Sequence, residues 1–258
     1  LGGLLRHLVD WRRLLVFLAL AGAGILVVTL LVFTETLAVE ARTGGGFSHA
    51  LQDFRTLLAD RVFLSAVLNQ GFLYAALFAY LAGATFVLQD IYGMSPQWYA
   101  AAFGLNSAGF MTFGYLAGRA AERWSIPGTL AIGGAVTGAG ALGLLLAGLT
   151  PMPLWVVIAS LFILASGVAI SSPPATTLAL AEYPQMAGTA SSLLGMVRFG
   201  FGGIAAPLVG VAGAMSILPL GIVTTTCALL AGVFCALLIS HRRRSAAAPA
   251  LARAHHRS

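Results

Sequence analysis

Seven long apolar runs, each nearly free of charged residues, make up most of the 258-residue chain. A helix of about 20 residues rises about 30 Å, which is the thickness of the hydrocarbon core of a bilayer. Runs of this length therefore predict membrane-spanning helices. We place them at residues 14–33, 63–89, 98–118, 129–149, 154–180, 188–213 and 216–240. The predicted fold class is all-α, a polytopic membrane protein with seven transmembrane helices.

The segments outside these runs divide the chain into four parts. Residues 34–61 combine acidic side chains and three Arg with the triplet Gly44-Gly45-Gly46, a composition typical of a flexible linker. One apolar run precedes this linker and six follow it. We therefore expect an N-terminal part at 1–33, a central cytoplasmic linker at 34–61, a six-helix bundle at 62–240 and a basic, disordered tail at 241–258.

The composition excludes a soluble globular protein. Hydrophobic residues account for 59% of the chain and charged residues for 9%, and the mean hydropathy is +0.93. All 14 basic residues are Arg, grouped in short stretches beside the apolar runs. Such groups are typical of contact with anionic lipids, so we expect membrane lipids and no nucleic acid as partners. Cys227 and Cys235 lack the spacing of a metal site, and we expect neither a metal nor a cofactor.

The distribution of Arg predicts the orientation, because Lys and Arg in short loops are retained in the cytoplasm. If the first run starts outside the cell, three Arg lie outside, namely Arg6, Arg12 and Arg13. Ten lie inside, namely Arg42, Arg55, Arg61, Arg119, Arg123, Arg242, Arg243, Arg244, Arg253 and Arg257. This split favours an external start of the first run and a cytoplasmic C-terminus.

Several short motifs carry a family resemblance. Thr34-Glu35-Thr36-Leu37 is similar to the PETL signature of the major facilitator superfamily, and residues 118–123 resemble the second copy of its cytoplasmic Gly-Arg loop. Residues 78–80, 86–89, 92–96, 103–106 and 187–192 resemble the Bcr/CflA branch of drug efflux proteins. Thr34 stands where the signature has Pro, and Arg198 lies where an uncharged residue is more usual.

The resemblance implies the C-terminal half of a twelve-helix fold plus one preceding helix, so that the chain is expected to be a fragment without its N-terminal half. It implies a secondary active transporter in the inner (plasma) membrane, exporting lipophilic drugs or small metabolites. Coupling to protons and alternating access between two six-helix halves are also implied. The proton-exchanging acid is expected in the missing half, because these runs contain no Asp or Glu away from their ends. We expect the chain alone not to transport.

Arg198 is the candidate with the clearest physical signal. It lies about ten residues into the sixth run, hence about 15 Å deep and close to the middle of the bilayer core. An Arg there costs about 2.5–3.5 kcal/mol, so it is expected to face the bundle interior and to have a partner. The two interpretations are a cation that contacts a ligand or a carboxylate, and a side chain that snorkels to the interface.

Other polar and aromatic residues of the runs are candidates for substrate contact. Asn69 and Tyr80 are eleven residues apart and fall on nearly the same helix face. Asn106 is flanked by Phe103 and Phe110 at helical spacing, which suits flat, lipophilic ligands. The predicted substrate-binding set is Asn69, Gln70, Tyr74, Tyr80, Phe103, Asn106, Phe110 and Arg198. The alternative is that the amides join helices, each contributing about 0.6–2 kcal/mol.

Charged residues at the cytoplasmic ends of the runs are candidates for a gate. Glu35 follows the first run, and Arg119, Glu122 and Arg123 follow the third. We predict that this set latches the two halves of the transporter together. The alternative is that these Arg only enforce topology.

Small residues at four-residue spacing predict close helix packing. Gly134 and Gly138, and Ala135 and Ala139 with Gly143, form small-xxx-small patterns in the fourth run. Because such patterns let two backbones approach closely, we expect a packing seam on this face.

Two other classes of function compete with the transporter. An enzyme is not expected, and no catalytic residue is predicted, because all five His lie outside the apolar runs. A seven-helix membrane receptor or sensor is the alternative, favoured by the number of runs. Its retinal-binding form would require a Schiff-base Lys, and the sequence contains no Lys.

Overall fold

The computed structural model describes residues 11–32, 47–211 and 216–255, and over these ranges the regular structure is helical. The helices are α2 (Trp11–Val32), α3 (Phe47–Ala59), α4 (Arg61–Thr85), α5 (Pro96–Arg123), α6 (Ile126–Leu149), α7 (Leu154–Leu180), α8 (Ala187–Val211) and α9 (Leu218–His255). A π-helical segment, η2 (Phe86–Ile91), extends α4, and a short 3-10 helix, η3 (Pro184–Met186), precedes α8. The predicted all-α fold class is confirmed.

Each of the seven predicted runs coincides with a helix, and six of these helical segments are long and apolar enough to cross a membrane within the described residues. The exception is α5, although its 28 residues exceed the length that a crossing needs. Polar and charged side chains, among them Asn106, Arg119 and Arg123, lower its apolar character. The helix is therefore present where the sequence predicts it, with a more polar surface than the other six.

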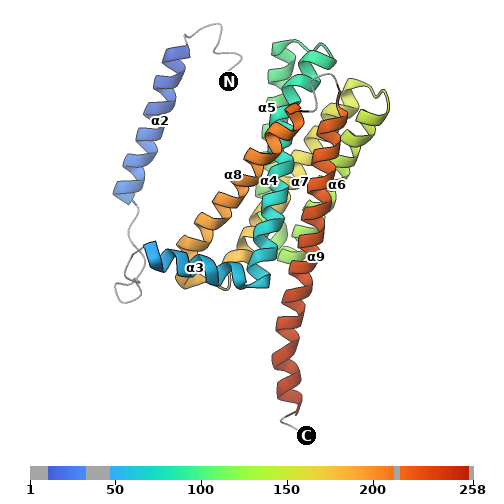
Figure 1. Cartoon of the computed structure of the whole chain (residues 1–258). Helices are drawn as coiled ribbons and strands as arrows, with labels where there is room; N and C mark the ends of the chain where they lie inside the picture. Colours follow the sequence, from blue (N-terminus) through green and yellow to red (C-terminus); the bar gives the residue numbers. More distant parts are fainter. Residues whose placement is uncertain (1–10, 33–46, 212–215, 256–258) are drawn as a thin grey trace.

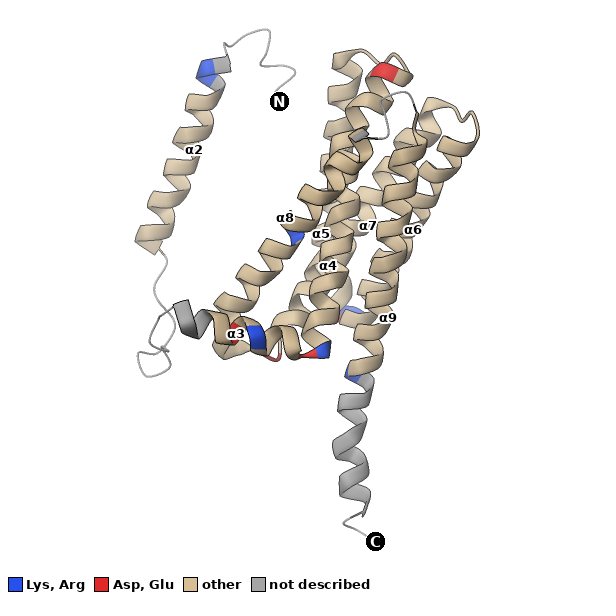
Figure 2. Cartoon of the chain, viewed as in Figure 1, with Lys and Arg blue, Asp and Glu red and all other residues tan. Residues whose placement is uncertain are grey.

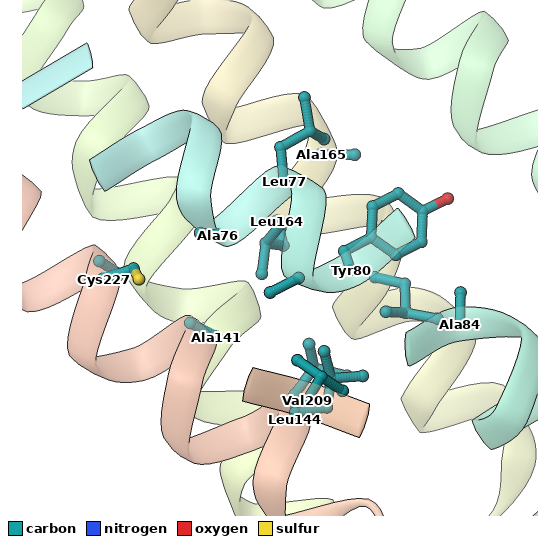
Figure 3. Close-up of a cluster of buried hydrophobic side chains, with 14 of the residues drawn as sticks. Ala76, Leu77, Tyr80, Ala84, Ala141, Leu144, Leu164, Ala165, Val209 and Cys227 are labelled. Atoms are coloured by element: carbon teal, nitrogen blue, oxygen red, sulfur yellow. The ribbon is translucent and has the colours of Figure 1, made fainter. Parts of the chain in front are cut away.

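The bundle is built around α4. This helix packs against α8, α9 and α7, while α6 lies between α7 and α9 and α5 packs mainly on α7 (Figure 1). Apolar side chains from these helices form a buried cluster that includes Leu77, Leu144, Leu164 and Val209, as Figure 3 shows. A second buried cluster, which includes Phe63, Leu178 and Leu238, lies toward the end of the bundle that α3 contacts. The core therefore has two layers along the bundle axis.

Glycine allows α6 and α7 to pack closely. A Cβ atom on Gly140 would lie 2.7 Å from the Cα of Leu164, and one on Gly133 would lie 2.7 Å from the backbone nitrogen of Ser171. Two residues of the predicted seam, Gly134 and Gly138, do not take part in this packing, because nothing lies within 4 Å of the corresponding positions on them in the described part of the chain. One residue rotates a helix by about 100°, so the neighbouring glycines face away from α7. Gly143, also part of the predicted pattern, does meet Ser160 of α7.

Part of the predicted central linker is the amphipathic helix α3. It lies across one end of the bundle (Figure 1), with Leu57 buried there and Leu51 exposed. Asp60 separates α3 from α4 and caps α4, because its Oδ1 accepts from the backbone nitrogens of Val62 (2.6 Å) and Phe63 (3.3 Å). The predicted flexible triplet, Gly44-Gly45-Gly46, lies outside the described residues.

The C-terminal segment differs from the disordered tail that the sequence predicts. Helix α9 continues without a break from Leu218 to His255. The continuation is rich in Ala, the residue with the highest helix propensity, which accounts for the difference. Arg242 in this helix forms an ion pair with Glu182, with 3.4 Å between Nη2 and Oε1.

Helix α2 stands apart from the bundle (Figure 1). Its apolar side chains are exposed on every side, and none of its membrane-length window is buried. A helix that is hydrophobic all round is stable only when lipid or protein surrounds it. The composition of α2 therefore fits a transmembrane helix and excludes a surface helix in water.

Candidate functional site

Charged residues gather at the ends of the bundle, with one exception. Figure 2 shows the acidic and basic residues of the bundle at its two ends and in α3, and a single basic position midway along α8. The only basic residue in α8 is Arg198, which is the twelfth of its 25 residues. The structure therefore places this cation midway along a helix that is long and apolar enough to cross a membrane.

Arg198 reaches sideways to two neighbouring helices. Its Nη2 donates a hydrogen bond to Oγ1 of Thr176 in α7 at 2.6 Å. Its guanidinium carbon lies 5.0 Å from the centre of the Tyr74 ring in α4, a cation–π geometry. The Nε atom is buried without a hydrogen-bond partner. This orientation argues against the snorkelling interpretation, because the side chain contacts α7 and α4 at mid-depth.

The partners of Arg198 belong to a polar group that we name the Thr176 cluster, composed of Gln70, Tyr74, Ser172, Thr176 and Arg198. Gln70 is fully buried, and its Nε2 donates to the Ser172 carbonyl (2.9 Å) and to Thr176 Oγ1 (3.2 Å). The Thr176 hydroxyl donates in turn to the Ser172 carbonyl at 2.9 Å. The Ser172 hydroxyl donates to the Tyr74 hydroxyl at 3.3 Å. The cluster joins α4, α7 and α8 in the interior of the bundle.

Two members of the Thr176 cluster are absent from the predicted site, namely Ser172 and Thr176 themselves. Both lie on α7, one turn apart, on either side of Pro173-Pro174. The signal that could have found them is this double proline, because it marks a turn in which backbone carbonyls lose their usual donors and nearby hydroxyls gain partners.

A second polar contact joins α4 to α5. Asn106 Nδ2 donates to the Tyr80 hydroxyl at 2.9 Å, and the Phe103 ring lies 6.4 Å from the Tyr80 ring, nearly parallel to it. In Figure 3 the Tyr80 hydroxyl points away from the labelled apolar side chains. Phe110 packs against the buried core. The structure therefore brings Tyr80, Phe103 and Asn106 together, and their contact with substrate stays a prediction.

Asn69 does not join either polar group. It is buried, and its Nδ2 donates to the Ala231 carbonyl of α9 at 2.8 Å. Although Asn69 and Tyr80 fall on nearly the same helical angle, they meet α9 and α5 respectively, because the central helix α4 has different neighbours at different heights. The contact of Asn69 favours the helix-joining alternative.

The predicted gate residues are not gathered around a common partner in the described part of the chain. Arg119 lies over the ring of Tyr115 in its own helix, at 4.8 Å from the centroid. Glu122 and Arg123 are exposed in the last turn of α5. Glu35 lies outside the described residues. The gate therefore stays a prediction.

The same end of the bundle contains a contact that the sequence does not predict. The Tyr183 hydroxyl donates to Oδ2 of Asp60, and the Tyr183 ring meets Phe63 edge-on at 5.6 Å. Burial, together with the Asp60 carboxylate, raises the pKa of Tyr183 above its ordinary value. The contact ties the connection between α7 and α8 to the start of α4.

A cavity of about 30 Å³ lies elsewhere, between η2, α8 and the start of α9. Its lining includes Phe86, Val209 and Leu220. This volume is enough for about one water molecule. The cavity is distinct from the Thr176 cluster and too small for a drug-sized ligand.

These features define a class of protein, a multi-pass α-helical membrane protein with polar side chains held at mid-depth. Residues 1–207 match the Major Facilitator Superfamily, and the chain belongs to this family. It is 31% identical over 208 residues to the uncharacterized MFS-type transporter YdgK of Bacillus subtilis (strain 168). The matched region covers 81% of this chain and 52% of the relative.

The chain is also 27% identical over 210 residues to the bicyclomycin resistance protein homolog of Haemophilus influenzae, again covering 81% of this chain and 52% of the relative. This similarity agrees with the resemblance to the Bcr/CflA branch. The chain spans about half the length of the curated relatives it matches. The family points to a transporter rather than an enzyme.

Proposed function

We propose that this chain contributes the C-terminal helices of a secondary active transporter that exports lipophilic drugs or small metabolites. Family membership supports transport in preference to the seven-helix receptor. The name of one relative, a bicyclomycin resistance protein homolog, supports efflux as the direction. Proton coupling, alternating access, a plasma-membrane location and a cytoplasmic C-terminus belong to the same proposal.

The observation that carries the proposal is the Thr176 cluster. Buried polar side chains are costly in a bilayer and mark substrate or ion pathways in membrane proteins. Here Gln70, Thr176 and Arg198 come from three different helices and meet at mid-depth. In secondary transporters, substrate sites lie near the bilayer midplane between helices that rearrange. The Tyr80–Asn106 pair is the second polar contact in this part of the proposed substrate path.

Alternating access requires helices that can bend, and two helices of the Thr176 cluster contain prolines. Pro173 and Pro174 lie inside α7, and Pro207 lies inside α8. Each proline removes a backbone donor and weakens the helix at that turn. The two helices that contribute Thr176 and Arg198 therefore contain built-in sites for bending.

An efflux assay tests the proposal. The whole reading frame is expressed in a bacterial strain without its main drug exporters, and accumulation of fluorescent lipophilic dyes and of bicyclomycin is measured. We expect expression to lower accumulation several-fold, and a protonophore to abolish the effect. Asn106→Leu, which removes a polar group without adding charge, is expected to restore accumulation at equal protein levels. Unchanged accumulation of every compound on expression contradicts the proposal.

A further inference from the structure

Arg198 has no carboxylate partner among the described residues of the bundle. The acidic residues described there lie away from Arg198 in the chain: Asp53 in α3, Asp60 at the start of α4, Asp90 in η2, Glu122 in the last turn of α5 and Glu182 after α7. The contacts of the guanidinium are a neutral hydroxyl and an aromatic ring. Its positive charge is therefore uncompensated at mid-depth.

The acceptor that Arg198 has in this cluster is shared with a second donor, and the buried Oε1 of Gln70 bonds to neither Arg198 nor any other described group. Arg198 Nη2 and Gln70 Nε2 both donate to Thr176 Oγ1, whose own hydrogen is directed to the Ser172 carbonyl. That oxygen has no capacity left for another donor. The Nε of Arg198 remains buried and unpartnered. The missing group is therefore an acceptor, and a carboxylate fits the fork of Nε and Nη2 with two parallel hydrogen bonds.

We propose that the Thr176 cluster binds the carboxylate of a flat, apolar compound, with Arg198 as its counter-charge. This inference rests on the proposed function and gives its substrate class: organic acids with an aromatic body. Tyr74 stacks below the guanidinium, and Phe199, the residue next to Arg198, is 68% exposed. The Tyr74 ring lies beside the charge, and the exposed Phe199 ring, which meets Phe78 edge-on at 5.9 Å, is a second aromatic surface one residue along α8 for the apolar part of such a compound.

A solute fits this site better than a lipid headgroup. Arg198 lies eleven residues after the first residue of α8, Ala187, which corresponds to about 16 Å along the helix. Headgroup phosphates lie outside the hydrocarbon core, whose half-thickness is about 15 Å. The anion that reaches Arg198 is therefore expected to be a diffusible compound.

Binding to the purified protein tests the inference independently of transport. Protein from the whole reading frame is reconstituted in nanodiscs of zwitterionic lipid, and binding of naphthoate and of its uncharged analogue naphthamide is measured. Arg198→Gln removes the charge in the cluster, and Arg55→Gln removes the same charge from the exposed side of α3 as the matched control. We expect naphthoate to bind at least tenfold more tightly than naphthamide to the unmodified protein and to Arg55→Gln. In Arg198→Gln this preference disappears while naphthamide binding is retained.

Several results overturn the inference. The first is that the unmodified protein binds both probes equally or binds neither. The second is an unchanged naphthoate affinity in Arg198→Gln. The third is displacement of naphthoate by phosphatidylglycerol added to the nanodiscs. If Arg198→Gln does not fold, Arg198→Lys keeps the charge without the planar fork, and the preference for naphthoate is expected to shrink several-fold. An unchanged preference in Arg198→Lys counts against the bidentate site. Failure of the efflux assay with intact naphthoate binding contradicts the proposed transport alone.

Discussion

A single hydroxyl group, that of Thr176, connects three helices. It accepts from Arg198 of α8 and Gln70 of α4 and donates to a carbonyl of its own helix. Most other threonine hydroxyls described in the bundle bond only to their own helix, as those of Thr137 and Thr177 do. Sequence alone cannot separate these cases, because both occur at apolar positions of the same kind of run. Arg198 and Gln70 were predictable, since a charge or an amide in lipid needs a partner, but the identity of that partner was not.

Thr176→Val is expected to destabilise the protein. The substitution keeps the shape of the side chain but leaves the donors on Arg198 and Gln70 without their shared acceptor, at a cost of about 1–3 kcal/mol. The thermal midpoint of the detergent-solubilised protein measures the effect. Thr177→Val is the matched control, since the Thr177 hydroxyl is exposed and bonds within α7. Thr176→Ser is expected to keep most of the stability. Equal midpoints for Thr176→Val and Thr177→Val would show that the shared acceptor contributes nothing.

At the scale of elements, apolar length and turn residues were sufficient to find the helices, and packing was harder to predict. Each predicted run coincides with a helix, and the breaks fall where Pro and Gly predict them. The face of α6 that meets α7 could not be assigned from the sequence, because glycine occurs at both 133 and 134 and the spacing of four fits more than one face. Only the contacts of Gly133 and Gly140 with α7 decide the register.

Gly140→Ala is expected to separate α6 from α7. The added methyl group would overlap the backbone of Leu164, which cannot move like the end of a flexible side chain, and overpacking of this kind costs about 1–3 kcal/mol. Gly138→Ala is the control in the same helix, with open space around the new atom. Its higher helix propensity is expected to leave stability unchanged or slightly raised. The measurement is the thermal midpoint of each variant, and a Gly140→Ala variant as stable as Gly138→Ala contradicts this packing.

At the scale of the whole molecule, the family and the class of fold could be read from composition and motifs. The motifs indicate the superfamily to which the chain belongs. The isolation of α2 and the crossing position of α3 could not be predicted, because apolar length gives no information about lateral neighbours. The orientation follows from the Arg distribution and stays a prediction.

Cysteine labelling of intact cells tests this orientation. In a protein with Cys227 and Cys235 replaced by Ala, Gln97→Cys places a thiol at the start of α5, and Glu122→Cys places one near its end. Both positions are exposed. A membrane-impermeant maleimide is expected to label Gln97→Cys several-fold more than Glu122→Cys until the cells are permeabilised. The reverse pattern would place the Arg-rich end outside the cell.

The bond from Arg198 to Thr176 ties together two helices, α7 and α8, that otherwise touch little. It is made two residues after Pro174, next to the turn of α7 in which two prolines remove backbone donors. A carboxylate on the fork of Nε and Nη2 would bond to the same nitrogen that donates to Thr176, and so would weaken this tie. Occupancy and helix geometry are then linked reciprocally: an anion that favours the released form is itself bound more tightly by it. The larger the difference between the anion's affinities for the two forms, the larger the fraction of molecules in which α7 and α8 move independently.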